Sequence, residues 1–162
     1  MWDLQANVNH NWLKLKIERV LKDQWIQKWQ RDVEQKPSCY LYEKYKTVYK
    51  LEKYLTLDSD LKWQILKIRT LNNKLPIVVG RYNGIERENR KCTLCRMNEI
   101  GDEYHFVLVC NNENLRSYRE QHIPLYFRTH PNLRKFVELI NSGSMKLLEN
   151  FSRYLKKSFV LL

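Results

Sequence analysis

Apolar residues recur every three or four positions along much of this chain, which is the spacing of one face of an α-helix. The first such stretch covers residues 11–35 and stops before Pro37, because the residue that precedes a proline disfavours helical geometry. The second follows Asp58, whose side chain can cap a helix, and continues to about residue 71. We therefore predict two long helices in the first half of the chain.

Two aromatic groups in this half leave alternatives open. Trp25 and Trp29 fall on the apolar stripe of the first predicted helix, which favours burial in the core over stacking against nucleic-acid bases. The segment 40–54 is dense in tyrosine and lysine. That composition fits a surface for single-stranded nucleic acid, and it equally fits short helices whose tyrosine rings are buried.

The second half predicts further helices separated by turn residues. Residues 75–82 predict an apolar link closed by a glycine turn at Gly80. Three more helices are expected to begin at Asn112 or Asn114, at Thr129-His130-Pro131 with the proline inside the first turn, and near Met145. We predict a mainly α fold, a small helical domain of about six helices. It forms a single unit over residues 1–162, with an N-terminal helical part (11–56), a core (57–119) and C-terminal helices (120–162).

The composition favours a helical protein with a polyanionic partner. The 162 residues include only four glycines and four prolines, which favours helices over a turn-rich β fold. The 29 lysines and arginines exceed the 18 acidic residues by 11, and such a balance points most often to nucleic acid. No signal peptide is visible, and no apolar run approaches the roughly 18 residues of a membrane span. We expect an intracellular protein, nuclear or cytoplasmic, with no membrane partner.

Four metal-binding side chains follow one another within a short segment. Cys92, Cys95, His105 and Cys110 form the pattern C-x2-C-x9-H-x4-C. Two cysteines separated by two residues can share a turn, and the histidine and the last cysteine complete a tetrahedral set that suits one structural zinc ion. The soft thiolates argue against magnesium or calcium. The alternative is three unrelated thiols and an ordinary histidine, since short motifs also occur by chance.

The residues around this motif fit the same prediction. The chain can turn at Gly101 and begin a short helix with Asp102 as its cap. Asp102 or Glu103 could also hold the second imidazole nitrogen of His105, as carboxylates often do for ligand histidines. Cys39 lies far upstream, and we expect it to be a small buried side chain outside the metal set.

Basic residues flank the predicted zinc loop and outnumber the acidic ones there. They are Arg81, Arg87, Arg90, Lys91 and Arg96, against Glu86 and Glu88. A rigid zinc loop would fix their positions, which favours a phosphate-contacting surface over an ordinary solvated loop. Tyr82 is available there for stacking on bases.

The central segment resembles the C-terminal region of non-LTR retrotransposon reverse transcriptases and is similar to the zinc-binding in reverse transcriptase domain. The residues that carry the resemblance are Arg69, Leu75-Pro76-Ile77, Gly80-Arg81-Tyr82, Arg90 to Cys95, Glu99 to Phe106, Cys110 and Leu115-Arg116. The resemblance implies a module that follows the polymerase and binds template RNA or target DNA. It implies Cys92, Cys95, His105 and Cys110 as zinc ligands, and it adds Arg69 and Arg116 to the expected nucleic-acid contacts.

This chain departs from that family in having no polymerase. No Asp-Asp pair occurs anywhere, and no spaced set of carboxylates predicts a nuclease. We therefore expect a non-catalytic protein with no small-molecule substrate, either a mobile-element fragment that acts with the remainder of a retrotransposon protein or a separate gene product. The alternative is a protein-interaction adaptor in which zinc only folds the scaffold and aromatics such as Trp2 and Trp12 meet a partner.

Overall fold

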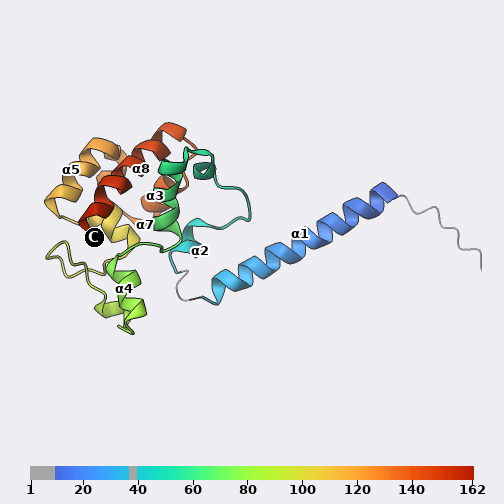
Figure 1. Ribbon diagram of the computed structural model, residues 1–162, viewed down its shortest axis with the longest axis horizontal. Helices are drawn as coiled ribbons and strands as arrows, with labels where there is room; N and C mark the ends of the chain where they lie inside the picture. The colour runs from blue at the N-terminus through green and yellow to red at the C-terminus, as the bar shows by residue number, and fades with distance from the viewer. Residues whose placement is uncertain (1–9, 37–39) are drawn as a thin grey trace, which may run out of the picture. The chain divides into compact units, whose positions relative to one another are not determined.

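Helices make up nearly all of the regular structure in residues 10–36 and 40–162, the part of the chain that the computed structural model describes (Figure 1). The prediction of a mainly α fold is confirmed, with eight α-helices in those ranges in place of the expected six or so. The chain divides into two units, residues 1–43 and 44–162. We predicted a single unit with an N-terminal part ending at residue 56, whereas the boundary in the structure follows Glu43.

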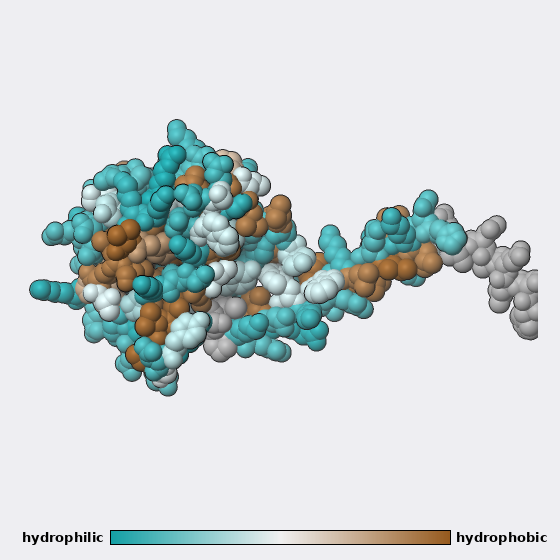
Figure 2. Space-filling view, viewed as in Figure 1, coloured by the Kyte–Doolittle hydropathy of each residue, from teal (hydrophilic) through white to brown (hydrophobic). Residues whose placement is uncertain are grey.

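The first unit contains one long helix, α1 (His10–Glu34), close to the predicted bounds. None of its residues is buried, and Trp25 is 59% exposed. The brown side chains along α1 in Figure 2 are its exposed leucine, isoleucine and valine residues. The predicted burial of Trp25 is therefore wrong within this unit, and Trp29 is only half-buried. Neither α1 nor any other helix of the described ranges has the length and apolar content to cross a bilayer.

The tyrosine-rich segment forms short helices around two buried rings. α2 (Tyr42–Tyr45) lies at the boundary between the units, and a 3-10 helix, η2 (Lys53–Thr56), follows it. Tyr45 and Tyr54 are buried, whereas Tyr40 and Tyr49 remain exposed. The structure thus favours buried rings for the first pair and leaves the second pair at the surface.

The core of the second unit is built around the last long helix. α8 (Met145–Ser158) packs against α3 (Ser59–Arg69) and α5 (Glu113–His122) (Figure 1). Steps of three and four residues bury Leu148, Phe151 and Leu155 on one face of α8. The Ser144 side chain accepts a hydrogen bond from the Leu147 amide (3.4 Å) and so caps the first turn.

Two further helices close this core. α7 (Leu133–Ile140) packs against α8 and against α6 (Leu125–Arg128), and a 3-10 helix, η5 (Phe159–Leu161), follows α8. Asn132 caps α7, because its side-chain oxygen accepts a hydrogen bond from the Lys135 amide (3.0 Å). Pro131 therefore precedes the cap. The prediction that this proline lies inside the first turn is wrong. The predicted cap at Asn112 is confirmed by its bond from the Leu115 amide (3.2 Å).

The apolar link predicted over residues 75–82 is instead a helix, α4 (Pro76–Tyr82). Pro76 occupies the first turn, where its missing amide proton costs nothing. Gly80 lies inside the helix. A Cβ atom at this position would come within 2.6 Å of the Arg90 Cγ, so a larger residue would force the two apart. The glycine therefore marks a close side-chain approach and not the turn that we expected. A 3-10 helix, η3 (Arg87–Asn89), follows α4.

Candidate metal centre

A short hairpin, residues 90–101, carries the first two cysteines. Its arms meet in an antiparallel bridge between Lys91 and Ile100, the one β contact in the described ranges. The Cys92 amide donates to the Glu99 carbonyl oxygen (2.9 Å). The intervening turn passes through Asn98, which has a φ of +56°. This geometry directs Cys92 and Cys95 toward the same point, as their spacing predicted.

A π-helix, η4 (His105–Val109), carries the third ligand, and the fourth follows it directly. Asp102 Oδ1 accepts a hydrogen bond from the His105 amide (2.9 Å), so the predicted cap at Asp102 is confirmed. The Cys110 amide donates to the His105 carbonyl oxygen (2.7 Å). This bond from residue i+5 to residue i is the π-helical pattern, whose hydrogen-bonded ring contains one residue more than that of an α-helix.

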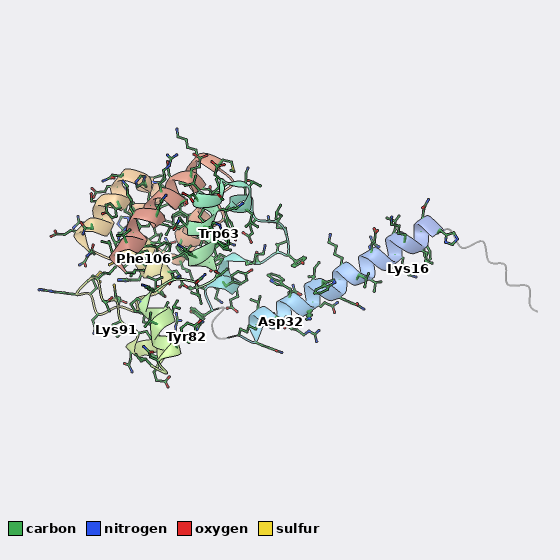
Figure 3. The ribbon with its side chains drawn as sticks, in the orientation of Figure 1. Lys16, Asp32, Trp63, Tyr82, Lys91 and Phe106 are labelled. Carbon is green, nitrogen blue, oxygen red and sulfur yellow. The ribbon has the colours of Figure 1, made fainter. Side chains whose placement is uncertain are left out.

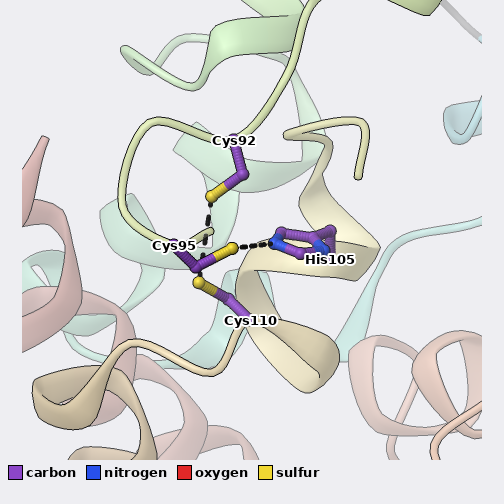
Figure 4. Close-up of side chains that lie close together, drawn as sticks. All are labelled: Cys92, Cys95, His105 and Cys110. Carbon is purple, nitrogen blue, oxygen red and sulfur yellow. Dashed lines mark hydrogen bonds between the residues drawn. The ribbon is translucent and has the colours of Figure 1, made fainter. Parts of the chain in front are cut away.

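The four ligand side chains meet at one place (Figure 4). Their ligand atoms all lie within 4.8 Å of one another. Cys92 Sγ and Cys110 Sγ are 3.8 Å apart, and Cys95 Sγ lies 3.3 Å from His105 Nε2. A zinc–sulfur bond of about 2.3 Å gives tetrahedral sulfur–sulfur edges of about 3.8 Å. The predicted ligand set is thus confirmed as a group that could hold one metal ion.

The Cys92 and Cys110 thiols lie within hydrogen-bonding distance of each other. This contact lowers the pKa of Cys92 to about 3 and raises the pKa of Cys110. The His105 and Cys95 side chains also lower the pKa of Cys92. A cluster that already favours one thiolate is chemically suited to a soft cation, because metal ligation requires deprotonated sulfur.

Core residues hold the π-helix from outside. The Tyr154 hydroxyl on α8 donates to the carbonyl oxygens of Phe106 (3.0 Å) and Val107 (3.3 Å). Arg119 on α5 donates to the carbonyl oxygens of Leu108 (3.0 Å) and Cys110. Arg119 is itself buried, and sequence reasoning missed it. Its spacing of four from buried Leu115 was the signal that could have located it.

Two acidic residues lie between the hairpin and the π-helix. Burial raises the pKa of Asp102, whose Oδ2 lies 3.6 Å from Arg87 Nη2. Burial also raises the pKa of Glu103 to about 7. Asp102 is thus engaged by a backbone amide and by Arg87, and it does not serve as the predicted partner of the imidazole. Its role in the structure is to fix the entry to the π-helix.

The hairpin is joined to α4 and to α5. The Ile77 amide donates to the Gly101 carbonyl oxygen (3.2 Å), and the Asn112 side chain donates to the Leu94 carbonyl oxygen (3.1 Å). Gly101 is needed at this contact, because a Cβ atom would lie 2.7 Å from the Pro76 Cγ. The ligand cluster, α4 and the start of α5 therefore form one connected part of the second unit.

Part of the predicted basic surface is open to solvent. Tyr82 is 78% exposed at the end of α4, and the Arg81 guanidinium lies 5.0 Å from its ring centroid. Arg96 and Arg116 are exposed, and Lys91 is half-buried. Figure 3 labels Tyr82 and Lys91 on the α4 side of this unit. These five residues form the set that we call the hairpin surface.

Two of the predicted arginines are used inside the fold. Arg90 Nε donates to the Ile85 carbonyl oxygen (2.8 Å) and its Nη1 to that of Ile77 (3.3 Å). Arg87 pairs with Asp102. Arg90 joins the start of the hairpin to α4, and Arg87 holds the segment that follows the hairpin, so replacing them would disturb the loop as well as its charge.

Arg69 is buried, and its predicted role as a nucleic-acid contact is wrong in this conformation. Its Nη2 lies 2.7 Å from Glu52 Oε2, and its Nη1 donates to the Ile140 carbonyl oxygen (3.1 Å). The guanidinium also lies over the rings of Tyr45 (4.7 Å) and Tyr54 (5.2 Å). With 2% of its surface exposed, Arg69 joins α3, α7 and the tyrosine-rich segment. A phosphate could not reach it.

Comparisons with known proteins add no relative. No protein-family model matches the chain, and no match was found among curated proteins or among solved structures. The resemblance of the central segment to retrotransposon reverse transcriptases therefore stays a prediction. Cys39 and Trp2 lie outside the described residues, so the predictions made for them also stand as predictions.

Proposed function

We propose that this protein is a zinc-stabilised nucleic-acid-binding module that is not catalytic by itself. The observation that carries the proposal is the cluster of Cys92, Cys95, His105 and Cys110, whose ligand atoms lie within 4.8 Å. One zinc ion bound there has four protein ligands and no open position for an activated water. Its role is to fold the hairpin and to fix the basic residues that it carries.

The charge of the chain supports nucleic acid as the partner. The sequence carries a formal net charge of +11, and an excess of this size favours binding to polyanions. The hairpin surface combines cations with one exposed aromatic ring, Tyr82. Cations contact the phosphate backbone of any strand, whereas a ring can stack only on bases that are unpaired. RNA and single-stranded DNA are therefore the expected ligands of Tyr82.

The resemblance to non-LTR retrotransposon reverse transcriptases supports the same function. In such a protein the module would act after the polymerase and hold template RNA or target DNA. The partner would then include the remainder of a retrotransposon protein. Salt-dependent nucleic-acid binding is expected whether or not that relationship holds, because it depends on charge alone.

The test is a binding series for the zinc-loaded full chain with single-stranded RNA, single-stranded DNA and duplex, across salt concentrations. The double variant Lys91→Ala/Arg96→Ala should weaken binding to all three. Each lost phosphate contact should reduce the log–log salt slope by roughly 0.7–0.9. Tyr82→Ala should cost single-strand binding about 1–3 kcal/mol and leave duplex binding unchanged.

A charge-matched control is available on the same unit. Lys74 and Lys156 are both exposed and lie outside the hairpin surface. The variant Lys74→Ala/Lys156→Ala should keep the parent salt slope, apart from the general effect of net charge. An unchanged slope in Lys91→Ala/Arg96→Ala with zinc still bound would contradict the proposed surface.

The exposed aromatic side chains of α1 favour a second candidate function, that of a protein-interaction adaptor. Trp12 is 56% exposed and Trp25 59% exposed on this helix. Aromatic residues are enriched where proteins bind other proteins. An adaptor would bind a protein partner through α1 with little dependence on salt, and it would bind nucleic acid no better after zinc loading than before.

A further inference from the structure

A cavity lies in the second unit, lined by residues that take no part in the metal centre. It has a volume of about 310 Å³ and is walled by the segment 45–54 and by the turn between α7 and α8. Three lysines line it, Lys46, Lys50 and Lys53, against one acid, Glu52. The charged lining therefore has an excess of positive over negative side chains.

The single acid of the lining is already neutralised. Glu52 Oε1 lies 2.5 Å from Lys46 Nζ, and its Oε2 lies 2.7 Å from buried Arg69 Nη2. Across the described ranges, neither Lys50 nor Lys53 forms an ion pair. Lys46 and Arg69 together carry more charge than Glu52. Lys50 and Lys53 also line the cavity, and no acid that the structure describes is paired with either. The cavity is thus a site of positive potential.

Two helix ends beside the cavity also affect how favourably an anion could bind there. Ser142 and Gly143 line it and lead into the amino end of α8, whose peptide dipoles favour an anion nearby. The carboxyl end of α7 contributes Ile140, whose carbonyl oxygen would oppose an anion. That oxygen accepts a hydrogen bond from Arg69 (3.1 Å), which offsets its negative charge.

The walls of the cavity are fixed, unlike a solvated stretch of lysines. The Tyr45 hydroxyl donates to the Arg69 carbonyl oxygen (2.8 Å), and the Asn141 side chain donates to the Tyr45 carbonyl oxygen (2.7 Å). The Lys46 side chain is only 10% exposed, and its Nζ also donates to the Lys50 carbonyl oxygen (2.6 Å). These bonds hold the segment that presents Lys50 and Lys53.

The geometry points to a phosphate-binding pocket at this cavity, with Lys50 and Lys53 as its cationic contacts. Its ligand is a phosphate group, either one carried by a nucleic-acid strand or a free phosphate of the same chemistry. Exposed Val48 and Leu51 line the same cavity and give a nucleotide base an apolar surface. The choice of a nucleic-acid strand as the source rests on the proposed function, whereas the site for phosphate rests on the cavity alone.

The test follows backbone amide NMR signals of the zinc-loaded full chain at constant ionic strength. The titrants are inorganic phosphate, adenosine monophosphate, and a short single-stranded oligonucleotide with and without a terminal phosphate. Saturable shifts are expected for amides of residues 46–53 and 142–148. The variant Lys50→Ala/Lys53→Ala should weaken the binding at least tenfold, and Lys74→Ala/Lys156→Ala should leave it within twofold.

The different titrants show whether the phosphate comes from a strand or is free. The different variants show whether this pocket or the hairpin surface is at fault if binding is not as expected. Tighter binding of the phosphorylated oligonucleotide than of inorganic phosphate indicates a strand end, and equal binding indicates free phosphate. Shifts that persist unchanged in Lys50→Ala/Lys53→Ala, with an unaltered denaturation midpoint, would overturn the pocket. In that case Lys91→Ala/Arg96→Ala still tests the hairpin surface, since its readout is the salt slope and not the shifts at residues 46–53.

Discussion

Helices α1 and α8 both carry apolar stripes, yet only α8 is buried. On α8 the buried residues combine steps of three and four, which keeps them on one face. On α1 the apolar residues advance mainly in fours, from Leu13 to Val33. Each step of four overshoots a turn of 3.6 residues by about 40°, so five steps rotate the stripe by about 200°. The stripe winds around α1 and presents no single face to a neighbour.

This difference teaches that apolar spacing predicts a helix more securely than it predicts burial. The burial of α8 depends on α3 and α5, which bring matching apolar faces of their own. Within the described residues of the first unit, α1 has no buried residue. We therefore expect the free energy of unfolding of the second unit to be insensitive to the apolar residues of α1, and the predictions below test that contrast.

The largest effect is expected from loss of the metal. Cys95→Ser removes one of four zinc ligands and should lower the zinc content from about one per chain to a small fraction. Hydrogen exchange should then accelerate strongly across residues 90–110 and remain unchanged in α1. Cys39→Ser is the control and should retain the metal. Purified protein that is fully folded without any metal would contradict the zinc site.

An intermediate effect is expected from the buried cation of the second unit. Arg69→Met leaves Glu52 without its buried partner and the Ile140 carbonyl oxygen without a donor, so it should destabilise by about 3 kcal/mol. Chemical denaturation monitored by Tyr and Trp fluorescence measures the change. Arg153→Met removes an exposed pair with Glu149 and should stay within about 0.5 kcal/mol. Equal losses of unfolding free energy in the two variants would contradict the placement of Arg69 in the core.

The smallest effect is expected on α1. Trp25→Ala deletes a large but exposed side chain and should change the unfolding free energy of the second unit by less than about 0.5 kcal/mol. Denaturation should be repeated at several protein concentrations. A loss above about 2 kcal/mol, or a midpoint that rises with protein concentration, would show that a partner or a second copy covers α1.

Local signals in the sequence were sufficient for the ligand cluster and for the longest helices. The spacing of Cys92, Cys95, His105 and Cys110 encodes a turn and a tetrahedral set, which needs no knowledge of distant contacts. The bounds of α1 follow from apolar periodicity and Pro37. The caps Asp102 and Asn112 follow from side chains that reach an amide three residues later.

Predictions from the sequence were wrong where a residue's environment is set by a partner far along the chain. Arg69 is buried because Glu52 and the Ile140 carbonyl oxygen approach it, and neither partner is within a helical turn of it. Gly80 indicated a turn, yet it is required by the side chain of Arg90, ten residues later. A charged or flexible residue carries no local mark that its partner comes from elsewhere in the fold.

The two halves of the ligand cluster differ in how firmly they are held, and this decides which half would gain more order from a bound metal. His105 and Cys110 are buried on a segment braced by Tyr154 and Arg119, whereas Cys92 and Cys95 are half-buried on the hairpin. The braced pair would lose little conformational entropy on binding a metal, whereas the hairpin pair would have to be ordered. The short tether between the two pairs keeps the hairpin cysteines at a high effective concentration near the braced pair. Metal exchange would accordingly proceed at the rate at which the hairpin opens, and a competing chelator would act on the Cys92 side.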